Sequence, residues 1–572
     1  MIAVSRLVRR PAQGPGAGEA GLTLIEMMVA ITIGMILVAA LLALFVNTAR
    51  TNNEMAKSNA QIENGRFAMQ LLAGDIAHAG FWGTYVPKFD NLGYTEKPAD
   101  APTAVPNPCL AYASWDTVVP NYRTNLIGIP VQSCDGDPNT CTAALAPAAC
   151  TTAVANQRIA PYGTDVLVVR HAAPCITGSA DTNCEADTAG KLYFQSSLCA
   201  DGVVPIPGRP AGGSATTIQL AADAPSDYTG MTVTLIDVTG AQLQSRKIAA
   251  YNTTTKLATL SAAWSPVPNF AVLSYSILPT ARAGATTSIT LQAPPTAATP
   301  TNLYSGMTVS LTGGTGAGQS RTISTCAGNP YVCAISGTWT SPDATTTYSI
   351  SEYKLDTSGL ALHKMGTDCN AAAVADKRKF VSNIYYVRTY SINPGDGIPS
   401  LVRSSFDLSG GVPQHPAAEA LVEGIEGFRV ELGIDSQESR CAPASNVDYT
   451  SVVNFVDPAL CTVNANLSAN TLPTNRGDGI SEGAFVRCTA AAPCTVAQLE
   501  NAVAVKLFVL ARNLQTSPGY TDAKTYCLGT ANPDGTCPDP SSKVGPFNDG
   551  YKRHLFSTTV RLGNVSGRRE SP

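Results

Sequence analysis

The most constraining feature of this chain is a long apolar run that begins directly after an acidic residue. Met27 to Val46 contains no charged residue, and only Thr32 and Gly34 interrupt its large apolar side chains. A helix needs about 20 such residues to cross a bilayer. Glu26 lies at the start of this run, where insertion of a carboxylate costs roughly 2.5–3.5 kcal/mol, so its presence indicates a functional role.

The residues before the run form a short polar leader. It carries three arginines, and its last residue, Gly21, begins the hexapeptide GLTLIE, which extends to Glu26. Positive residues beside a spanning segment stay in the cytoplasm, so the rest of the chain is expected to cross the membrane. Two simpler interpretations are an ordinary signal peptide and an uncleaved signal anchor. Small residues near Ala39 permit the first, but neither accounts for an acid-terminated hexapeptide ahead of the apolar run.

This arrangement resembles the class III signal of type IV pilins and type II secretion pseudopilins. The resemblance implies that a prepilin peptidase cleaves after Gly21, makes Leu22 the mature N-terminus and methylates the new amine. Most pilins begin with Phe, so Leu22 is a departure from the family. The resemblance also implies that the Glu26 carboxylate pairs with the N-terminal amine of a neighbouring subunit in a fibre. Leu24 and Ile25 would then pack laterally in the fibre core.

Composition and cysteine usage fit an exported chain of several domains. The 572 residues give room for two to four domains, and charged residues make up only 14% of them. The net charge of −4 offers no electrostatic footprint for nucleic acid. There are 16 cysteines, and an even number in an exported region indicates disulfides. Zinc sites usually need CxxC spacing, which does not occur.

Ten cysteines form close pairs with turn residues between them, which makes them candidate disulfides. These pairs are Cys134 with Cys141, Cys175 with Cys184, Cys326 with Cys333, Cys488 with Cys494, and Cys527 with Cys537. Closing a loop of this size contributes roughly 2.5 kcal/mol in the chain-entropy model. A sixth pair, Cys441 with Cys461, is plausible. The remaining four cysteines are Cys109, Cys150, Cys199 and Cys369, of which the last two are matched with each other.

The helix is expected to continue beyond the apolar run. Apolar residues recur every seven positions, with one more on the same side: Met55, Ile62, Met69, Ile76 and Leu72. Such a stripe is typical of an amphipathic helix. Gly80 predicts its end, so one helix should run from Leu22 to Ala79. Its second half would pack on a globular head, although a coiled-coil dimer is also compatible with the spacing.

Short alternating apolar segments predict a β-rich head. They lie at residues 165–170, 191–195, 380–390, 401–408, 421–434, 502–512 and 556–565. Several longer stretches resemble the PilW family of large minor pilins: GRFAMQLLAGDIAHAGFWG (65–83), YGTDVLVVRHA (162–172), LVEGIEGFRVELGID (421–435), AVAVKLFVLAR (502–512) and DGYKRHLFSTTVRLGN (549–564). The resemblance implies an α+β, pilin-like fold in which the long N-terminal helix packs on an antiparallel β-sheet head.

Between these stretches lies an internal repeat. Residues 228–251 match residues 304–326, and Trp264 matches Trp339. Each copy alternates Thr- and Val-rich segments with glycine turns, which predicts two small β modules in tandem. Pro- and Ala-rich segments at 203–214 and 292–301 are interpreted as the linkers that bracket them. The modules form an insertion in the head, and a Cys199–Cys369 bridge would close its base.

The expected organisation has five parts. A leader (1–21) is followed by the long helix (22–80, with 22–46 transmembrane), the first part of a pilin-type head (81–205), the inserted β repeats (206–350) and the second part of the head (351–572).

No pattern for catalysis, a cofactor or a metal emerges. The five histidines are scattered without an HExxH pair: His78, His171, His363, His415 and His554. Asp135 begins a short acidic turn that resembles a calcium loop, but the glycine and terminal glutamate of an EF-hand are missing. The basic residues near the C-terminus are expected to be solvated, with contacts to acidic neighbours as the alternative: Lys552, Arg553, Arg568 and Arg569.

The PilW resemblance implies a structural role rather than an enzymatic one. It implies a minor pilin of a bacterial type IV pilus that helps to initiate assembly near the tip. A large head would also block repeated packing along a fibre shaft. Implied partners are prepilin peptidase, other minor and major pilins, the inner membrane and a tip adhesin, with no nucleic acid. The head would be periplasmic before assembly and on the cell-surface fibre afterwards.

Three alternatives remain open. The chain could be a type II secretion pseudopilin, a pilus-associated adhesin that binds through the inserted modules, or an exported enzyme held by a signal anchor. The missing catalytic cluster argues against the third.

Overall fold

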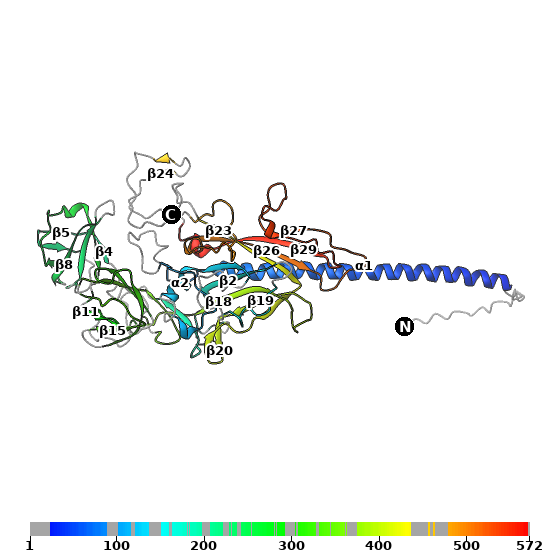
Figure 1. The fold of residues 1–572 in the computed structure, drawn as a ribbon, viewed down its shortest axis with the longest axis horizontal. Coiled ribbons are helices and arrows are strands. Elements are labelled where there is room, and N and C mark those ends of the chain that lie inside the picture. Colours follow the sequence, from blue (N-terminus) through cyan, green and yellow to red (C-terminus); the bar gives the residue numbers. More distant parts are fainter. Residues whose placement is uncertain are drawn as a thin grey trace, which may run out of the picture. The chain divides into compact units, whose positions relative to one another are not determined.

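The computed structural model (Figure 1) has two compact units, Met1–Ala60 and Gln61–Pro572. It describes residues 23–87, 101–115, 121–136, 150–158, 163–179, 181, 184–196, 206–220, 228–229, 231–236, 242–252, 254–278, 281, 283–291, 304, 307–327, 331–343, 345–360, 362, 374–435, 456–457, 462–463 and 479–569.

One long helix, α1 (Leu24–His78), accounts for the N-terminal part of the chain. It ends where the sequence predicts, because Gly80 adopts a left-handed φ of +73°. The Gly80 N–H donates to the Arg170 carbonyl at 3.0 Å and so ties the helix end to the head. Glycine is favoured here because a Cβ strains this backbone conformation.

Within the second unit, the apolar stripe of α1 packs on the head from Gln61 onward. Met69, Leu72 and Ile76 are buried, whereas Met55 is 59% exposed. Met55 lies in the first unit, and its packing on the head stays a prediction. Gln61, expected on the polar face, is buried and donates its side-chain amide to the carbonyl of Ala511 at 2.7 Å. The buried face of α1 therefore begins with a polar residue that is hydrogen-bonded to the head.

The first sheet of the head is antiparallel, in the order β1-β2-β18-β19-β22, with β3 joined to β18 and β17 joined to β3. Its strands are β1 (Val131–Asp135), β2 (Asp165–Ala172), β3 (Tyr193–Ser196), β17 (Tyr353–Asp356), β18 (Lys377–Arg388), β19 (Ser400–Ser405) and β22 (Glu419–Glu423). The sequence predicts β2, β3, β18 and β19. It does not predict β1 or β17, and it treats β22 and β23 as one segment, 421–434, which the structure divides at Gly424.

The second sheet has the order β23-β26-β29, with β23 (Ile425–Ile434), β26 (Ala502–Arg512) and β29 (Arg553–Arg561). The expected alternation in β26 is confirmed. Val505, Leu507 and Val509 join the core that includes α1, while Phe508 and Leu510 join a smaller cluster of their own. A period of two residues places these sets on opposite faces.

Gly424 connects the two sheets. It separates β22 from β23 and has a φ of +74°, and a Cβ at this position would lie 2.8 Å from the Arg512 carbonyl oxygen. The main core therefore collects residues of α1 and of both sheets in one cluster. Figure 1 shows the C-terminal half of α1 running along β2 and β26. This packing is the pilin-like α+β arrangement that the sequence predicts.

The chain leaves and re-enters the head through paired strands. β3 ends at Ser196, and β17 begins at Tyr353, which is the Cα partner of Ser196 in an antiparallel ladder. The β modules lie in the sequence between these two residues. They are therefore inserted as the connection of one long hairpin.

Both modules have the same topology. The first sheet has the order β4-β10-β7-β8-β9-β6-β5, and the second has the order β11-β12-β15-β14-β13-β16. Read from its other end, the second order repeats the first strand for strand, except that no described strand corresponds to β4. The first module contains β4 (Ile206–Gly208), β5 (Gly212–Gly213), β6 (Thr217–Gln219), β7 (Thr232–Ile236), β8 (Gln242–Asn252), β9 (Leu257–Leu260) and β10 (Ser274–Leu278). The second contains β11 (Ala283–Ala285), β12 (Ser288–Leu291), β13 (Thr308–Gly313), β14 (Ser320–Ala327), β15 (Tyr331–Ile335) and β16 (Thr347–Ile350).

The structural repeat begins earlier than the sequence repeat suggests. Ile218 and Ile289 are buried equivalents in β6 and β12, ahead of the matched segments. The proposed linkers are wrong for the same reason. The segment 203–214 contains β4 and β5, and the segment 292–301 falls between β12 and β13, inside the second module. These segments are loop-forming in composition, but they connect strands rather than modules.

The first module closes on itself. β4 pairs with β10 at one end of the sheet order, and β5 pairs with β6 at the other. The short stretch from Ile206 to Gly213 therefore joins both edges, which leaves few unpaired backbone groups. In the second module, the Ala281 N–H donates to the Thr346 carbonyl at 2.8 Å, at the corresponding place.

The remaining elements are short. They are the helices α2 (Tyr122–Gly128), α3 (Val496–Glu500) and α4 (Gly563–Ser566), the 3-10 turns η2 (Tyr112–Ser114), η3 (Phe270–Val272) and η4 (Pro540–Ser542), and the strands β20 (Asp407–Ser409), β21 (Val412–Gln414), β24 (Val456–Asp457), β25 (Thr462–Val463), β27 (Tyr526–Cys527) and β28 (Lys543–Val544).

Candidate functional site: the N-terminus of the long helix

The N-terminus of α1 is closed by a reciprocal pair, Thr23 and Glu26. The Thr23 N–H and hydroxyl donate to the Glu26 carboxylate at 3.0 and 2.9 Å, and the Glu26 N–H donates to the Thr23 hydroxyl at 3.3 Å. This is a capping box, in which an N-cap Thr and an acid three residues later satisfy each other's backbone donors. The sequence spacing carries this signal, but the sequence prediction missed it.

The capping box changes the energetics of the acid at the start of the apolar run. A carboxylate without partners would face the full cost of leaving water. Here Glu26 accepts two hydrogen bonds and lies at the positive end of the helix dipole, and both effects stabilise the ionised form. The carboxylate can therefore enter a nonpolar environment together with its local partners.

The first turns of α1 expose apolar side chains on every side. Leu24 is 80% exposed and Ile25 is 71% exposed. An 18-residue window of α1 is apolar enough to cross a membrane, and none of that window is buried. Thr32, a polar interruption, donates its hydroxyl to the Met28 and Val29 carbonyls at 2.9 Å. The helix therefore presents a surface suited to lipid or to other apolar helices. Gly21 and Leu22 lie outside the described residues.

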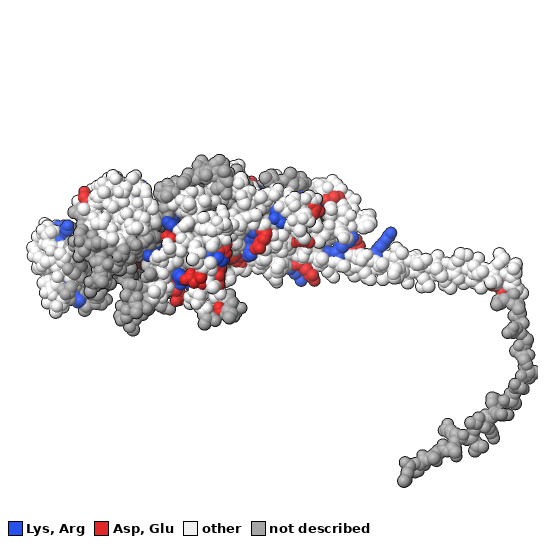
Figure 2. Space-filling model, turned by 90° about the horizontal axis from the view of Figure 1, so that it is seen from below, with Lys and Arg blue, Asp and Glu red and all other residues white. Residues whose placement is uncertain are grey.

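Charges are sparse over the visible surface. Figure 2 shows red and blue side by side in small groups over the head, and an almost uncharged N-terminal helix with red only near its start. Adjacent opposite charges cancel at a distance. This face of the described surface has no basic stripe of the kind that nucleic acid needs.

Asp75 fixes the C-terminal half of α1 to the first sheet. It accepts hydrogen bonds from Asn383 and Tyr385, both at 2.9 Å, and contacts His171 Nε2 at 3.0 Å. His171 Nδ1 faces the Ala172 carbonyl at 2.8 Å, so both ring nitrogens face acceptors. Burial alone would raise the pKa of Asp75, but the contacts with His171, Asn383 and Tyr385 together hold that pKa below its ordinary value.

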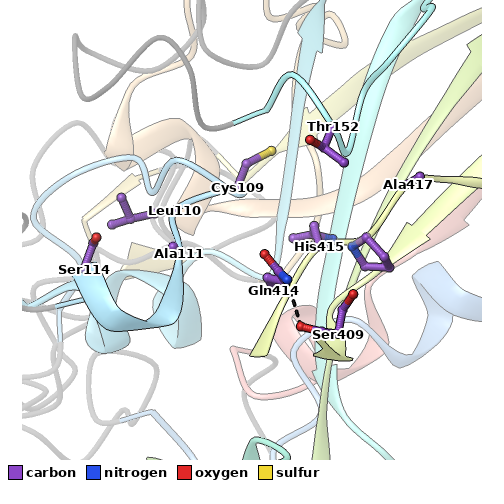
Figure 3. A pocket seen from close by; sticks show the side chains of 10 residues that line it. Cys109, Leu110, Ala111, Ser114, Thr152, Ser409, Gln414, His415 and Ala417 are labelled. Atoms are coloured by element: carbon purple, nitrogen blue, oxygen red, sulfur yellow. Dashed lines mark hydrogen bonds between the residues drawn. The ribbon is translucent and has the colours of Figure 1, made fainter. Parts of the chain in front are cut away.

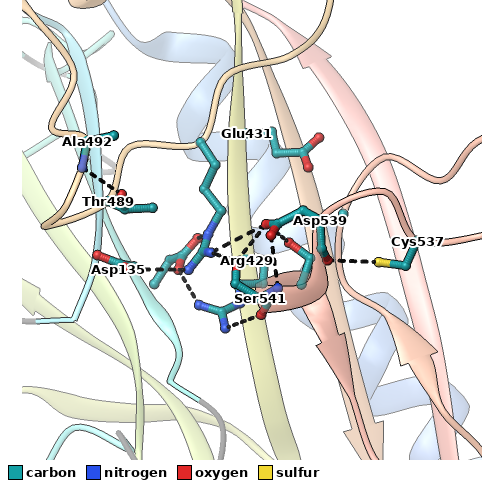
Figure 4. A network of polar contacts seen from close by, with 12 residues as sticks. Asp135, Arg429, Glu431, Thr489, Ala492, Cys537, Asp539 and Ser541 are labelled. Atoms are coloured by element: carbon teal, nitrogen blue, oxygen red, sulfur yellow. Dashed lines mark hydrogen bonds and ion pairs between the residues drawn. The ribbon is translucent and has the colours of Figure 1, made fainter.

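Asp165 joins the two sheets through buried ion pairs. It lies at the start of β2 and accepts from Arg429 Nη1 and Arg487 Nη2, both at 2.8 Å, and from the Val430 N–H at 2.9 Å. Figure 4 shows Arg429 and Ser541 in the middle of this network, with Asp135 and Asp539 on either side. The network connects segments that are far apart in the sequence, so it stabilises the junction of the sheets.

Of the C-terminal basic residues, Arg553 and Arg569 are not solvated as expected but contact acidic side chains, which is the alternative that the sequence left open. The Arg553 side chain is fully buried and binds Glu426, Asp522 and Asp549. Arg569 is 2% exposed and donates to the Asn501 side chain at 2.6 Å. Asp549 is only four residues from Arg553, but Glu426 is 127 residues away and Asn501 is 68 residues from Arg569, so charge pattern alone could not reveal this burial.

Five disulfides join described cysteines. Four are close pairs, Cys175–Cys184, Cys326–Cys333, Cys488–Cys494 and Cys527–Cys537. The fifth, Cys109–Cys150, spans 41 residues and was not assigned from the sequence. Cys134 is also disulfide-bonded, but Cys141 lies outside the described residues. The pairs proposed for Cys441 with Cys461 and for Cys199 with Cys369 also lie outside them.

Two of the described histidines are neighbours, because the His78 and His171 rings lie 5.6 Å apart between centroids. His171 contacts Asp75, His415 is buried near two serines, and His78 and His554 are exposed. His363 lies outside the described part of the chain. Among the residues that the structure describes, no group of three or more His, Cys, Asp or Glu side chains is placed to hold a metal ion.

Two family models match this chain. Residues 384–564 match type IV pilus-assembly protein W, and residues 17–42 match the prokaryotic N-terminal methylation motif. These matches confirm the resemblance to the PilW family with a prepilin-type signal. No curated protein matches the chain. Among solved structures, a type IV-like pilin from Thermus thermophilus is 15% identical and covers 33% of this chain and 70% of its own, with a TM-score of 0.16.

Proposed function

We propose that this chain is a minor pilin of a bacterial type IV pilus, processed by prepilin peptidase between Gly21 and Leu22. The observation that carries the proposal is the capped Glu26 at the start of an exposed apolar helix. The two family matches support it from both ends of the chain, because one covers this signal and the other covers the second part of the head.

Glu26 is the assembly residue in this proposal. In the single chain, Thr23 supplies its hydrogen bonds. A carboxylate has about four acceptor positions, so it can take a further donor without losing Thr23. The amine of Leu22 in a neighbouring subunit would add a charge-assisted hydrogen bond as both groups leave water. Leu24 and Ile25, which are exposed here, would be covered by neighbouring helices.

We place the chain at the start of assembly, near the tip of the fibre. The unit from Gln61 to Pro572 is large, and the inserted modules enlarge it further. A fibre shaft repeats one subunit at short intervals, so a head of this size favours a terminal position. The partners would be prepilin peptidase, other minor and major pilins, the inner membrane and a tip adhesin. The head would be periplasmic before assembly and exposed at the cell surface afterwards.

Mass spectrometry of sheared pili, compared with the membrane fraction, tests the proposal. A peptide that begins at Leu22, with or without one methyl group, is expected in the sheared fibres. Its presence only in membranes would favour a pseudopilin or a transient primer. An intact leader in both fractions, in cells with active peptidase, would contradict the proposal.

A pair of variants sharpens this test. Gly21→Val should block cleavage, because the peptidase site must admit a residue without a side chain at the scissile bond. Ala20→Val changes the neighbouring residue by the same kind of substitution and should still be cleaved. Equal cleavage of both variants would show that processing does not depend on Gly21.

The modules suggest an additional adhesive role. The first module has its own hydrophobic core, in which every buried residue lies between Ile218 and Ile277. Such a unit adds surface to the head without completing its main core. Replacement of residues 197–352 by a short turn should leave piliation normal. Lost attachment would then support adhesion through the modules, and unchanged attachment would exclude it.

A further inference from the structure

The head contains a partly open cavity of about 470 Å³ beside the Cys109–Cys150 disulfide (Figure 3). Its amide and imidazole already have partners, because the Gln414 side chain donates to the Ser409 carbonyl at 2.8 Å and the His415 ring faces two serine hydroxyls. A larger set of hydrogen-bonding groups without partners lies on the backbone of β29, at one edge of the second sheet.

Two hydrogen bonds at the ends of the β26–β29 ladder fix the direction of the backbone groups in β29. At one end the Asn513 N–H donates to the Lys552 carbonyl at 3.0 Å, and at the other the Leu562 N–H donates to the Val503 carbonyl at 2.8 Å. The register between these bonds is continuous. Successive residues of an antiparallel strand point their N–H and C=O groups to opposite sides. The even-numbered residues of β29 therefore face β26, and the odd-numbered residues face away from it.

Three outward-facing residues, Leu555, Ser557 and Thr559, leave this edge open. In the described part of the chain, β29 pairs with β26 alone, and no other described residue binds the N–H or C=O groups of these three. Ser557 and Thr559 are also exposed. The edge therefore presents a row of N–H donors and C=O acceptors that have no partner within the described head.

The opposite edge of the same sheet is satisfied. On β23, the Val430 N–H donates to the Asp165 carboxylate at 2.9 Å. Two residues further along, Leu432 exchanges hydrogen bonds with Val486 at 2.7 and 2.8 Å. β29 also lacks the features that usually protect an edge, since it has nine residues, no proline, no lysine and no shift of register. The open edge is therefore a specific property of β29.

The spacing of these groups identifies what can bind to them. Donors and acceptors that recur at every second residue match the backbone of an extended peptide, as in strand addition to an exposed edge. The charges nearby add a preference. β29 contains no acidic residue and exposes Arg561, and Arg66 of α1 is exposed next to Gly65, whose backbone meets Phe556 of β29. An acidic side chain in the added strand would therefore be attracted.

Two copies of this chain are poorly suited to pair with each other at β29. The second half of α1 runs in the same direction as β29, since Gly65 meets Phe556 and the Asn564 side chain donates to the Ala77 carbonyl at 3.2 Å. Antiparallel pairing would point the two α1 helices in opposite directions, whereas one membrane holds them in the same direction. Parallel pairing in register would place the two Arg561 side chains next to each other, where like charges repel.

We propose that the edge of β29 binds an acidic, extended segment of a partner protein, which adds a fourth strand to the second sheet. The backbone of Leu555, Ser557 and Thr559 supplies the hydrogen bonds, and Arg561 and Arg66 attract the acidic side chain. Binding at this edge does not depend on processing of the N-terminus.

Hydrogen exchange of the full-length protein in detergent, resolved to single residues by mass spectrometry, tests the proposal. The probe is a capped hexapeptide that alternates valine with threonine and glutamate. Without the peptide, exchange should be fast at Ser557 and Thr559 and slow at Thr558, because only Thr558 donates to β26. Saturating peptide should slow exchange at Ser557 and Thr559 by roughly tenfold or more. No slowing at these two residues would overturn the proposal.

The same hexapeptide with every backbone nitrogen methylated provides the control. It keeps the side chains but has no backbone N–H donor, so it should leave exchange at Ser557 and Thr559 unchanged. Equal slowing by the two peptides would show binding through side chains and would contradict strand addition.

A matched pair of variants at Thr559, whose side chain is exposed, tests the preference for an acid. Thr559→Glu places a carboxylate on the edge and should weaken binding of the glutamate-containing peptide roughly tenfold or more, because like charges repel at short range. Thr559→Gln has nearly the same size without the charge and should bind the peptide as the parent does. Equal binding by the two variants would contradict an acidic partner segment.

A concentration series without peptide distinguishes a partner protein from a second copy. Exchange at Ser557 that does not depend on protein concentration supports a partner protein. Exchange that slows as the concentration rises would show that a second copy occupies the edge, and the assignment to a partner protein would be wrong. None of these measurements uses a pilus, so a failure here is distinct from a failure of the proposed processing.

Discussion

The backbone of Gly65 in α1 lies directly against the ring of Phe556 in β29. A Cβ at residue 65 would come 2.1 Å from Phe556 Cε2, so the ring must move before any side chain can fit. Gly65→Ala should therefore lower the free energy of unfolding by about 1–3 kcal/mol, as overpacked cores do. Thermal unfolding of the full-length chain measures this effect.

Gly74 provides the control for that substitution. It lies in the same helix, and a Cβ there would meet nothing within 4 Å. Gly74→Ala should raise the free energy of unfolding by up to about 1 kcal/mol, because alanine is the better helix former. If Gly65→Ala and Gly74→Ala changed the free energy of unfolding in the same direction, the contact with Phe556 would not be what determines the effect at residue 65.

Thr23 is predicted to control the environment of Glu26. Thr23→Val keeps the shape of the side chain but removes its hydroxyl, which costs about 1 kcal/mol of helix capping and one hydrogen bond to the carboxylate. We expect fewer assembled subunits in sheared pili, measured by quantitative mass spectrometry. Thr23→Ser retains the hydroxyl and should assemble normally. Equal assembly of the two variants would show that the capping box is dispensable.

The contact of Asp75 predicts sensitivity to acid. The pKa of Asp75 is held below its ordinary value of 3.8, so its contribution to stability is complete above pH 3.8. That contribution is lost as the pH falls through the lowered pKa. Asp75→Asn should be less stable than the parent at pH 7, and the difference should shrink below pH 3.8. Unfolding curves at several pH values measure it.

A surface acid gives the comparison for this pH profile. Asp187 forms an ion pair with Lys377, and its side chain is 51% exposed. Asp187→Asn should change stability little at any pH, since exposed ion pairs contribute less than about 1 kcal/mol. A gap between the parent and Asp75→Asn that stayed constant down to pH 2 would contradict the role of the Asp75 charge.

Removal of the Asp165 charge should weaken the junction of the two sheets. Asp165→Asn leaves Arg429 and Arg487 buried without their shared counter-ion, which costs about 3–5 kcal/mol. Calorimetry should show a large fall in melting temperature. Asp539→Asn removes a peripheral acid, 49% exposed and 4.0 Å from Arg487, and should have a small effect. A small effect of both substitutions would contradict the importance of the buried pairs.

Local patterns were sufficient to predict much of the fold. The seven-residue stripe of α1 predicts the packing of Met69 and Ile76, and strict alternation predicts the two faces of β26. These features depend on neighbours within one element, so the sequence displays them directly.

The buried charges could not be predicted in this way. Asp165 meets Arg429 across 264 positions, and Arg553 meets Glu426 across 127. Only the tertiary fold brings such residues together. The candidate site was predicted in part, because Glu26 was identified from its place beside the apolar run, whereas its partner Thr23 was overlooked. That omission was avoidable, since the spacing of a capping box is visible in the sequence.

The pairing of Ser196 with Tyr353 has a consequence for how this head can evolve. Loop-closure entropy grows only with the logarithm of loop length, so exchanging a short turn for the whole insertion costs roughly 3 kcal/mol at that hairpin. A folded insert whose ends lie close together avoids part of even this cost. The hairpin between β3 and β17 can therefore gain, duplicate or lose whole domains while the surrounding sheet keeps its register. The exposed surface of the inserted domains can thus change faster in evolution than the sheet to which they are attached.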